Sequence, residues 1–238
     1  MPSSENHIVR SFTEEINTLS TQIGRMGGHA ESILTDSIQA LLRRDNDLAL
    51  RAIESDRRVD GLDAEIEAEV VRLLALRQPV ANDLRTVISA LKIAQSLERI
   101  ADHAKNGAKR ALIINQAPQM EQTRSILRLY EVAHEMLRGV LDAYANADAA
   151  AALAVRERDE DLDILYDGYF RECLTYMMED SRNITPTTHL LFIAKNLERI
   201  GDHCTNISEN VYYMRTGERL GPARPRADDL DPKRRETA

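Results

Sequence analysis

Two ten-residue stretches of the sequence nearly repeat each other, and this repetition is the strongest constraint on the fold. LERIADHAKN begins at Leu97 and LERIGDHCTN begins at Leu197, so the copies start 100 residues apart and share seven of their ten residues. Two further matching acidic residues, Asp56 and Asp159, lie 103 residues apart. Two such similar offsets indicate an internal duplication, so we expect a molecule made of two similar halves.

The sequence before Gly217 has the apolar periodicity of amphipathic helices almost throughout. Asp45 or Asn46 can cap the second helix of the first half, and Asp148 has the same place in the second half. Pro79 ends the second helix. The expected helices cover about residues 11–44, 46–77, 82–114, 120–145, 148–180 and 187–216.

Three long helices in each half, joined by short connections, predict two three-helix bundles in tandem. The fold class is therefore all-α. We expect the first bundle over residues 1–117 and the second over 118–216, with a boundary at the NQAP stretch. Residues 217–238 are rich in proline, glycine and charge, and they predict a disordered tail.

The composition excludes several classes of protein. Aromatic residues make up only 4% of the chain, which is low for an all-β protein. A net charge of −8 argues against nucleic-acid binding. Cys173 and Cys204 lack the spacing of a disulfide framework or a zinc site. We find no signal peptide and no apolar run long enough to span a membrane, and we expect a cytoplasmic protein.

Four pairs of acidic residues stand at i,i+4 spacing, two pairs in each half at equivalent places. Like charges at this spacing destabilise a helix by a few tenths of a kcal/mol, about 0.2–0.5 per pair, so four pairs need a reason. They are either solvated helix faces or the ligands of a cation in each half. Carboxylates are hard oxygen ligands, which favour Mg²⁺, Mn²⁺ or iron over zinc or copper. The candidate metal ligands are Asp56, Asp60, Glu98, Asp102, Asp159, Asp163, Glu198 and Asp202.

The pairs Glu98/Asp102 and Glu198/Asp202 are expected to be the principal ligands, because helical phase places both members at the edge of a buried face. An iron-dependent enzyme would need Glu-x-x-His on two helices, but the sequence has this spacing only at Glu131. Phosphate-binding loops and nucleophile motifs are also absent from the sequence. We therefore predict no catalytic residues.

Two longer segments resemble the PhoU family of phosphate-signalling regulators. They are QPVANDLRTVISALKIAQSLERIADHAKN and LLFIAKNLERIGDHCTNISENVYY, and the resemblance extends from about Phe12 to Gly217. It implies two tandem three-helix bundles, often as a homodimer, with metal bound at the acidic pairs in some members. The DLR at residues 83–85 has no clear second copy, which sets the two halves apart.

The resemblance also implies a function. Members are cytoplasmic negative regulators of the phosphate-starvation response and of high-affinity phosphate uptake. They act with the ATPase subunit of the phosphate transporter and with a membrane sensor histidine kinase. A pseudo-symmetric pair of bundles suits a scaffold better than a catalytic cleft, so we expect a non-enzymatic regulator. The alternative is a metal-dependent enzyme or a metal store built on a helical bundle.

Overall fold

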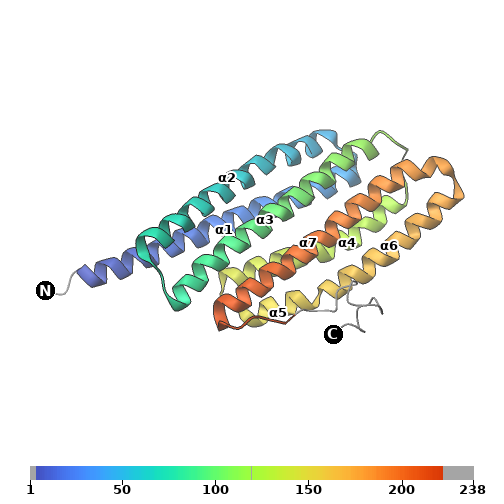
Figure 1. Cartoon of the computed structure of the whole chain (residues 1–238). Helices are drawn as coiled ribbons and strands as arrows, with labels where there is room; N and C mark the ends of the chain where they lie inside the picture. The colour runs from blue at the N-terminus through green and yellow to red at the C-terminus, as the bar shows by residue number, and fades with distance from the viewer. Residues whose placement is uncertain (1–3, 119, 222–238) are drawn as a thin grey trace, which may run out of the picture.

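The computed structural model describes residues 4–118 and 120–221, which are helical along most of their length and contain no strand. The first half forms three helices, α1 (Ser4–Arg43), α2 (Asn46–Arg77) and α3 (Ala81–Ile114). They pack on one another as a three-helix bundle (Figure 1). The predicted all-α class is confirmed.

The second half repeats this arrangement with one difference. It contains α4 (Gln122–Ala145), α5 (Ala149–Glu157), α6 (Asp159–Glu179), a short 3-10 helix η1 (Ser181–Asn183) and α7 (Ile184–Thr216). We expected one helix over 148–180, and this prediction was wrong, because Arg158 separates α5 from α6. The first turn of α6 holds Asp159, Glu160 and Asp161, and acidic residues stabilise a helix N-terminus.

Equivalent aspartates begin the second helix of each half. The Asp45 side chain accepts a hydrogen bond from the backbone N–H of Leu48 at 2.9 Å. Asp148 accepts from the N–H groups of Ala150 and Ala151 at 2.9 and 3.0 Å. Each side chain satisfies donors that the first helical turn leaves without partners, so both predicted caps are confirmed.

The two bundles pack against each other along their lengths, mainly through α3 and α7, which lie side by side in Figure 1. The helices α1 and α4 make a second contact. There a Cβ on Gly27 would lie 2.4 Å from Leu141 Cδ2, so any larger residue at position 27 would force the Leu141 side chain to move. The apolar core continues from each bundle to this interface.

The connection between the bundles is held in place by one arginine. Arg44 donates hydrogen bonds to the carbonyl oxygens of Asn115 and Ala117 at 2.5 and 2.6 Å. The boundary at 117/118 falls in this connection and stays a prediction. The tail predicted over 217–238 lies outside the described residues from residue 222 onward. In the part of the chain that is described, no helix is long and apolar enough to cross a membrane.

Candidate functional site

The predicted acidic residues of the first bundle line the contact between α2 and α3. Asp56 is buried, with 5% of its surface exposed, whereas Asp60 is exposed. Glu98 and Asp102 are half-buried, as their helical phase predicted. The two helices therefore bring these carboxylates to one face of the bundle, but they do so around a residue that the sequence analysis did not single out.

That residue is Lys105, whose ammonium group lies between two of the carboxylates. Lys105 Nζ is 2.5 Å from Asp56 Oδ2 and 2.8 Å from Asp102 Oδ1. Asn106 donates a further hydrogen bond to Asp102 at 3.1 Å. Burial alone would raise the pKa of Asp102, but the hydrogen bond and the charge of Lys105 outweigh burial and lower it. The first acidic cluster thus contains its own cation.

At Glu98 and Asp63, in the same cluster, no cation outweighs the effect of burial on the pKa. Burial raises the pKa of Glu98, and the negative charges of Asp102 and Asp63 add to the effect, although Arg99 at 3.2 Å opposes it. Asp63 was not predicted. Its pKa is raised by burial, and then by the charges of neighbouring acids that include Asp60. Its place three residues after Asp60 is the sequence signal that could have identified it.

The second bundle has Thr205 where the first has Lys105. Thr205 is 8% exposed, and its hydroxyl has no hydrogen-bond partner among the described residues. The equivalent acids are Asp159 and Asp163 on α6 and Glu198 and Asp202 on α7. Because threonine carries no charge, this cluster keeps more of its mutual repulsion than the first.

The repulsion is visible at Asp202. The residue is exposed at the surface, but the bulk of protein around its carboxyl group raises its pKa to about 6. The charges of Glu198, Asp159 and Asp163 contribute further, in that order. Glu198 is paired through one oxygen with Lys195 at 2.6 Å, while its other oxygen is buried without a hydrogen-bond partner among the described residues.

These arrangements bear on the predicted metal sites. Among residues 4–118 and 120–221, no group of three or more histidine, cysteine or acidic side chains is arranged to hold a metal ion. In the first bundle, Lys105 stands where a cation would bind. In the second bundle no lysine enters at that position, and the orphaned oxygens of Glu198 and Thr205 are suited to a hard cation.

A cavity of about 640 Å³ lies beside the first cluster, where α2, α3 and α7 meet. Asp60, Asp63 and Glu98 line one part of it, and Arg99 and His203 line another. Its lining is therefore polar and of mixed charge. A small cation or a zwitterionic molecule is the kind of ligand that such a lining can hold.

The two copies of the repeated phrase meet at the interface between the bundles. The rings of His103 and His203 lie 5.6 Å apart between centroids, with a 30° interplanar angle. Burial lowers the pKa of both rings, and that of His203 falls to about 4. Both histidines are half-buried. His134, which completes the Glu-x-x-His spacing that begins at Glu131, pairs with Glu31 of α1 at 2.8 Å.

Comparison with known proteins gives a consistent result. The family model described as "PhoU domain" matches the chain twice, over residues 23–111 and 126–211. The chain is 51% identical over 225 residues to the "Phosphate-specific transport system accessory protein PhoU homolog" of Caulobacter vibrioides, covering 94% of this chain and 98% of that protein. It is 39% identical over 212 residues to the accessory protein PhoU of Escherichia coli, covering 89% and 88%.

The crystal structure of PhoU from Pseudomonas aeruginosa has the same fold. It superposes with a TM-score of 0.85 at 36% identity, covering 87% of this chain and all of that chain. The phosphate transport system regulatory protein PhoU from Streptococcus pneumoniae superposes with a TM-score of 0.82 at 29% identity, covering 89% and 100%.

Proposed function

Because the chain belongs to the PhoU family, we propose that it is a cytoplasmic negative regulator of the phosphate-starvation response and of high-affinity phosphate uptake. The observation that carries this proposal is the match of both halves to the family's domain, together with relatives named as accessory proteins of the phosphate-specific transport system. Those names favour a regulator over a metal-dependent enzyme or metal store.

The proposed mechanism is that of a scaffold. The transporter's ATPase subunit and a membrane sensor histidine kinase bind to the two bundles, and the regulator keeps kinase output low while phosphate is plentiful. Two features support this role. The helices α3 and α7 carry the two copies of the repeat side by side. A helix of about 33 residues is roughly 50 Å long, which leaves separate surfaces for two partners. A homodimer would double these surfaces.

Gene deletion in cells tests the regulatory role. In phosphate-rich medium, deletion should switch on a reporter of the starvation response, and the wild-type gene should restore repression. A reporter that stays silent in the deletion strain would remove the proposal. Affinity purification from phosphate-replete cells should recover the ATPase subunit and the kinase, and recovery of neither would remove the scaffold mechanism alone.

We further propose that regulation depends on a divalent cation held by the second acidic cluster, where Glu198 and Asp202 would be the principal ligands. Burial and the repulsion of neighbouring acids raise the pKa of Asp202. A bound cation would replace that repulsion with attraction. The presence of Lys105 in the first cluster favours unequal sites. Titration with Mn²⁺ or Mg²⁺ should show one class of site, which the double variant Glu198→Gln, Asp202→Asn lacks. Unaltered binding in that variant would contradict the assignment.

A further inference from the structure

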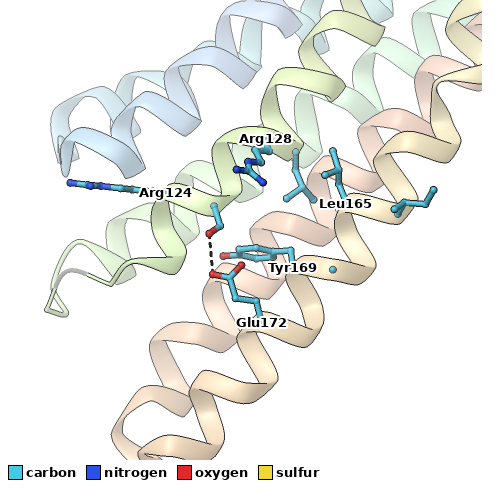
Figure 2. A pocket seen from close by; sticks show the side chains of 9 residues that line it. Arg124, Arg128, Leu165, Tyr169 and Glu172 are labelled. Carbon is cyan, nitrogen blue, oxygen red and sulfur yellow. Dashed lines mark hydrogen bonds between the residues drawn. The ribbon is translucent and has the colours of Figure 1, made fainter.

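An open groove of about 380 Å³ lies between α4 and α6 in the second bundle. Leu129, Ile164, Leu165 and Tyr169 form its apolar lining, and Arg124 and Arg128 stand on its α4 side. Figure 2 shows Arg128 above the groove, with Leu165 and Tyr169 on the helix opposite. The groove is therefore apolar inside and cationic on one side.

The apolar lining is accessible because of two features of α6. Ile164 is 64% exposed, although it is a large hydrophobic residue. A Cβ added to Gly168 would meet no other atom within 4 Å, so the absence of a side chain there keeps the groove open. Tyr169 is fixed beside it, since its hydroxyl donates to the carbonyl oxygen of Gln122 at 3.1 Å.

The charges on the groove are available for a partner. Neither Arg124 nor Arg128 forms an ion pair with any described residue. The groove's own carboxylate, Glu172, accepts a hydrogen bond from the Ser125 hydroxyl at 3.0 Å instead (Figure 2). Arg128 lies over the groove, whereas Arg124, four residues earlier on α4, extends away from it (Figure 2). Both are long, flexible cations at the α4 edge of the groove, so each can bind a carboxylate of a bound segment.

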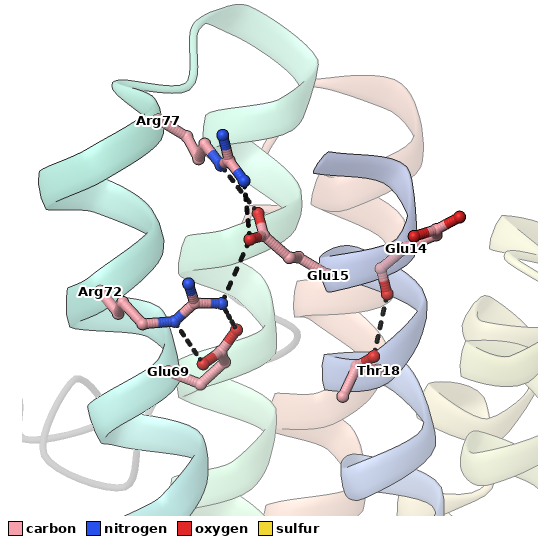
Figure 3. Close-up of polar contacts among 6 residues, drawn as sticks. All are labelled: Glu14, Glu15, Thr18, Glu69, Arg72 and Arg77. Atoms are coloured by element: carbon pink, nitrogen blue, oxygen red, sulfur yellow. Dashed lines mark hydrogen bonds and ion pairs between the residues drawn. The ribbon is translucent and has the colours of Figure 1, made fainter. Parts of the chain in front are cut away.

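The equivalent region of the first bundle also holds a cavity, of about 330 Å³, but the arginine that lines it, Arg72, is already paired with carboxylates. Glu69, the counterpart of Glu172, pairs with Arg72 at 2.6 Å, and Glu15 of α1 pairs with Arg77 at 2.9 Å and with Arg72 at 3.3 Å (Figure 3). The unpaired arginines are thus a property of the second bundle and not of the repeated fold.

The sequence of this chain contains a segment of complementary character. Residues 228–231 read Asp-Asp-Leu-Asp, which places one leucine among three carboxylates. The described residues end at Gly221, whose carbonyl oxygen accepts a hydrogen bond from Arg156 of α5 at 2.6 Å. Leu230 lies nine positions after Gly221, and nine extended residues span up to about 30 Å.

That reach is sufficient for the groove. Arg156 and Leu165 are nine residues apart along α5 and α6, which corresponds to about 14 Å of helix. We propose that residues 228–231 bind in the α4/α6 groove of their own chain, with Leu230 against Ile164 and Leu165 and the aspartates at Arg124 and Arg128. This inference stands independently of the proposed function.

Trypsin provides the test in the intact protein, because the Arg226–Ala227 bond lies just before the proposed binding segment. Cleavage at a protected bond follows the fraction of molecules in which the segment is released. A segment bound in ten molecules for each one released therefore slows cleavage about tenfold. Mass spectrometry of timed samples gives the rate at this bond.

Three full-length variants should speed this cleavage to the same extent. Leu230→Ser removes the apolar contact, the double variant Arg124→Gln, Arg128→Gln removes the charge, and Gly168→Gln fills the groove with a residue that favours helix. Two matched controls should leave the rate unchanged. Arg171→Gln alters an exposed arginine of α6 that does not line the groove, and Glu236→Gln alters an acid outside the segment.

Two results would overturn the proposal. One is an equal cleavage rate in the wild type and in all three groove and segment variants, with circular dichroism showing that every variant is folded. The other is protection that disappears on dilution, since binding within one chain does not depend on protein concentration. Such protection would place the segment on a second copy.

Discussion

Replacing Lys105 by threonine would give the first bundle the residue that the second bundle has at the equivalent position. Lys105 Nζ contacts Asp56 and Asp102 at 2.5 and 2.8 Å, and Asp56 is buried. Removing one partner of a buried ion pair costs about 3–5 kcal/mol. Solvent reaches Asp102 and offsets part of this loss, so we expect the free energy of unfolding to fall by about 3 kcal/mol.

Thermal unfolding measures this loss directly. For a chain of this size, 1 kcal/mol corresponds to about 2–4 °C, so the Tm should fall by roughly 6–12 °C. Lys109→Thr is the matched control, because Lys109 is an exposed lysine on the same helix. If both variants lose the same stability, the buried carboxylate does not depend on Lys105 and the reasoning fails.

The same variant separates the two acidic clusters by their response to metal. Without Lys105, the first cluster loses its internal cation, so Mn²⁺ should raise the Tm of Lys105→Thr more than that of the wild type. Saturation at a hundred times Kd adds about 2.7 kcal/mol for each new site. Thr205→Lys should have the opposite effect and reduce the metal response. An equal response in all three proteins would refute the idea that Lys105 replaces a metal ion.

Two further pairs of variants test the remaining arguments. Because the folded-state pKa of Asp202 is about 6, above its unfolded value, the contribution of Asp202 to stability should rise as pH falls through 6 toward about 4. Burial lowers the pKa of His203 to about 4, which destabilises the protein over the same pH range, so the Asp202 effect is measured as the difference between the wild type and Asp202→Asn. Asp202→Asn should remove this rise and increase the Tm at pH 7, whereas Asp102→Asn should lower the Tm there. Thermal scans from pH 4 to 8 measure both. Gly27→Val should destabilise by about 2 kcal/mol through its clash with Leu141, while Gly28→Ala, which meets open space, should stabilise by up to about 1 kcal/mol in urea unfolding.

The sequence predicted the helices well because their signals are local. Apolar periodicity located the long helices, and Asp45 and Asp148 marked equivalent starts. The break at Arg158 was missed, although the acidic run after it resembles the first turn of a new helix. Periodicity continues across that break, so it gave no warning.

The chemistry of the site was predicted less completely, because it depends on which side chains meet across helices. Phase on a single helix placed Glu98 and Asp102 at the edge of the core, as found. It could not show that Lys105 of α3 reaches Asp56 of α2, since that contact requires the packing of both helices. The two clusters differ in where their lysine lies: Lys105 bridges Asp56 and Asp102 in the first, whereas the second has Thr205 there and Lys195 beside Glu198.

The contact between His103 and His203 couples the effects of substitutions in the two halves of the chain. Most equivalent positions in a duplicated chain are far apart, and the effects of changing both then add. These two rings touch, so each residue is part of the other's environment. Once either ring is removed, the second has already lost its partner. The double change should therefore cost less stability than the sum of the single changes. At this pair, a substitution in one half changes the effect of a substitution in the other half.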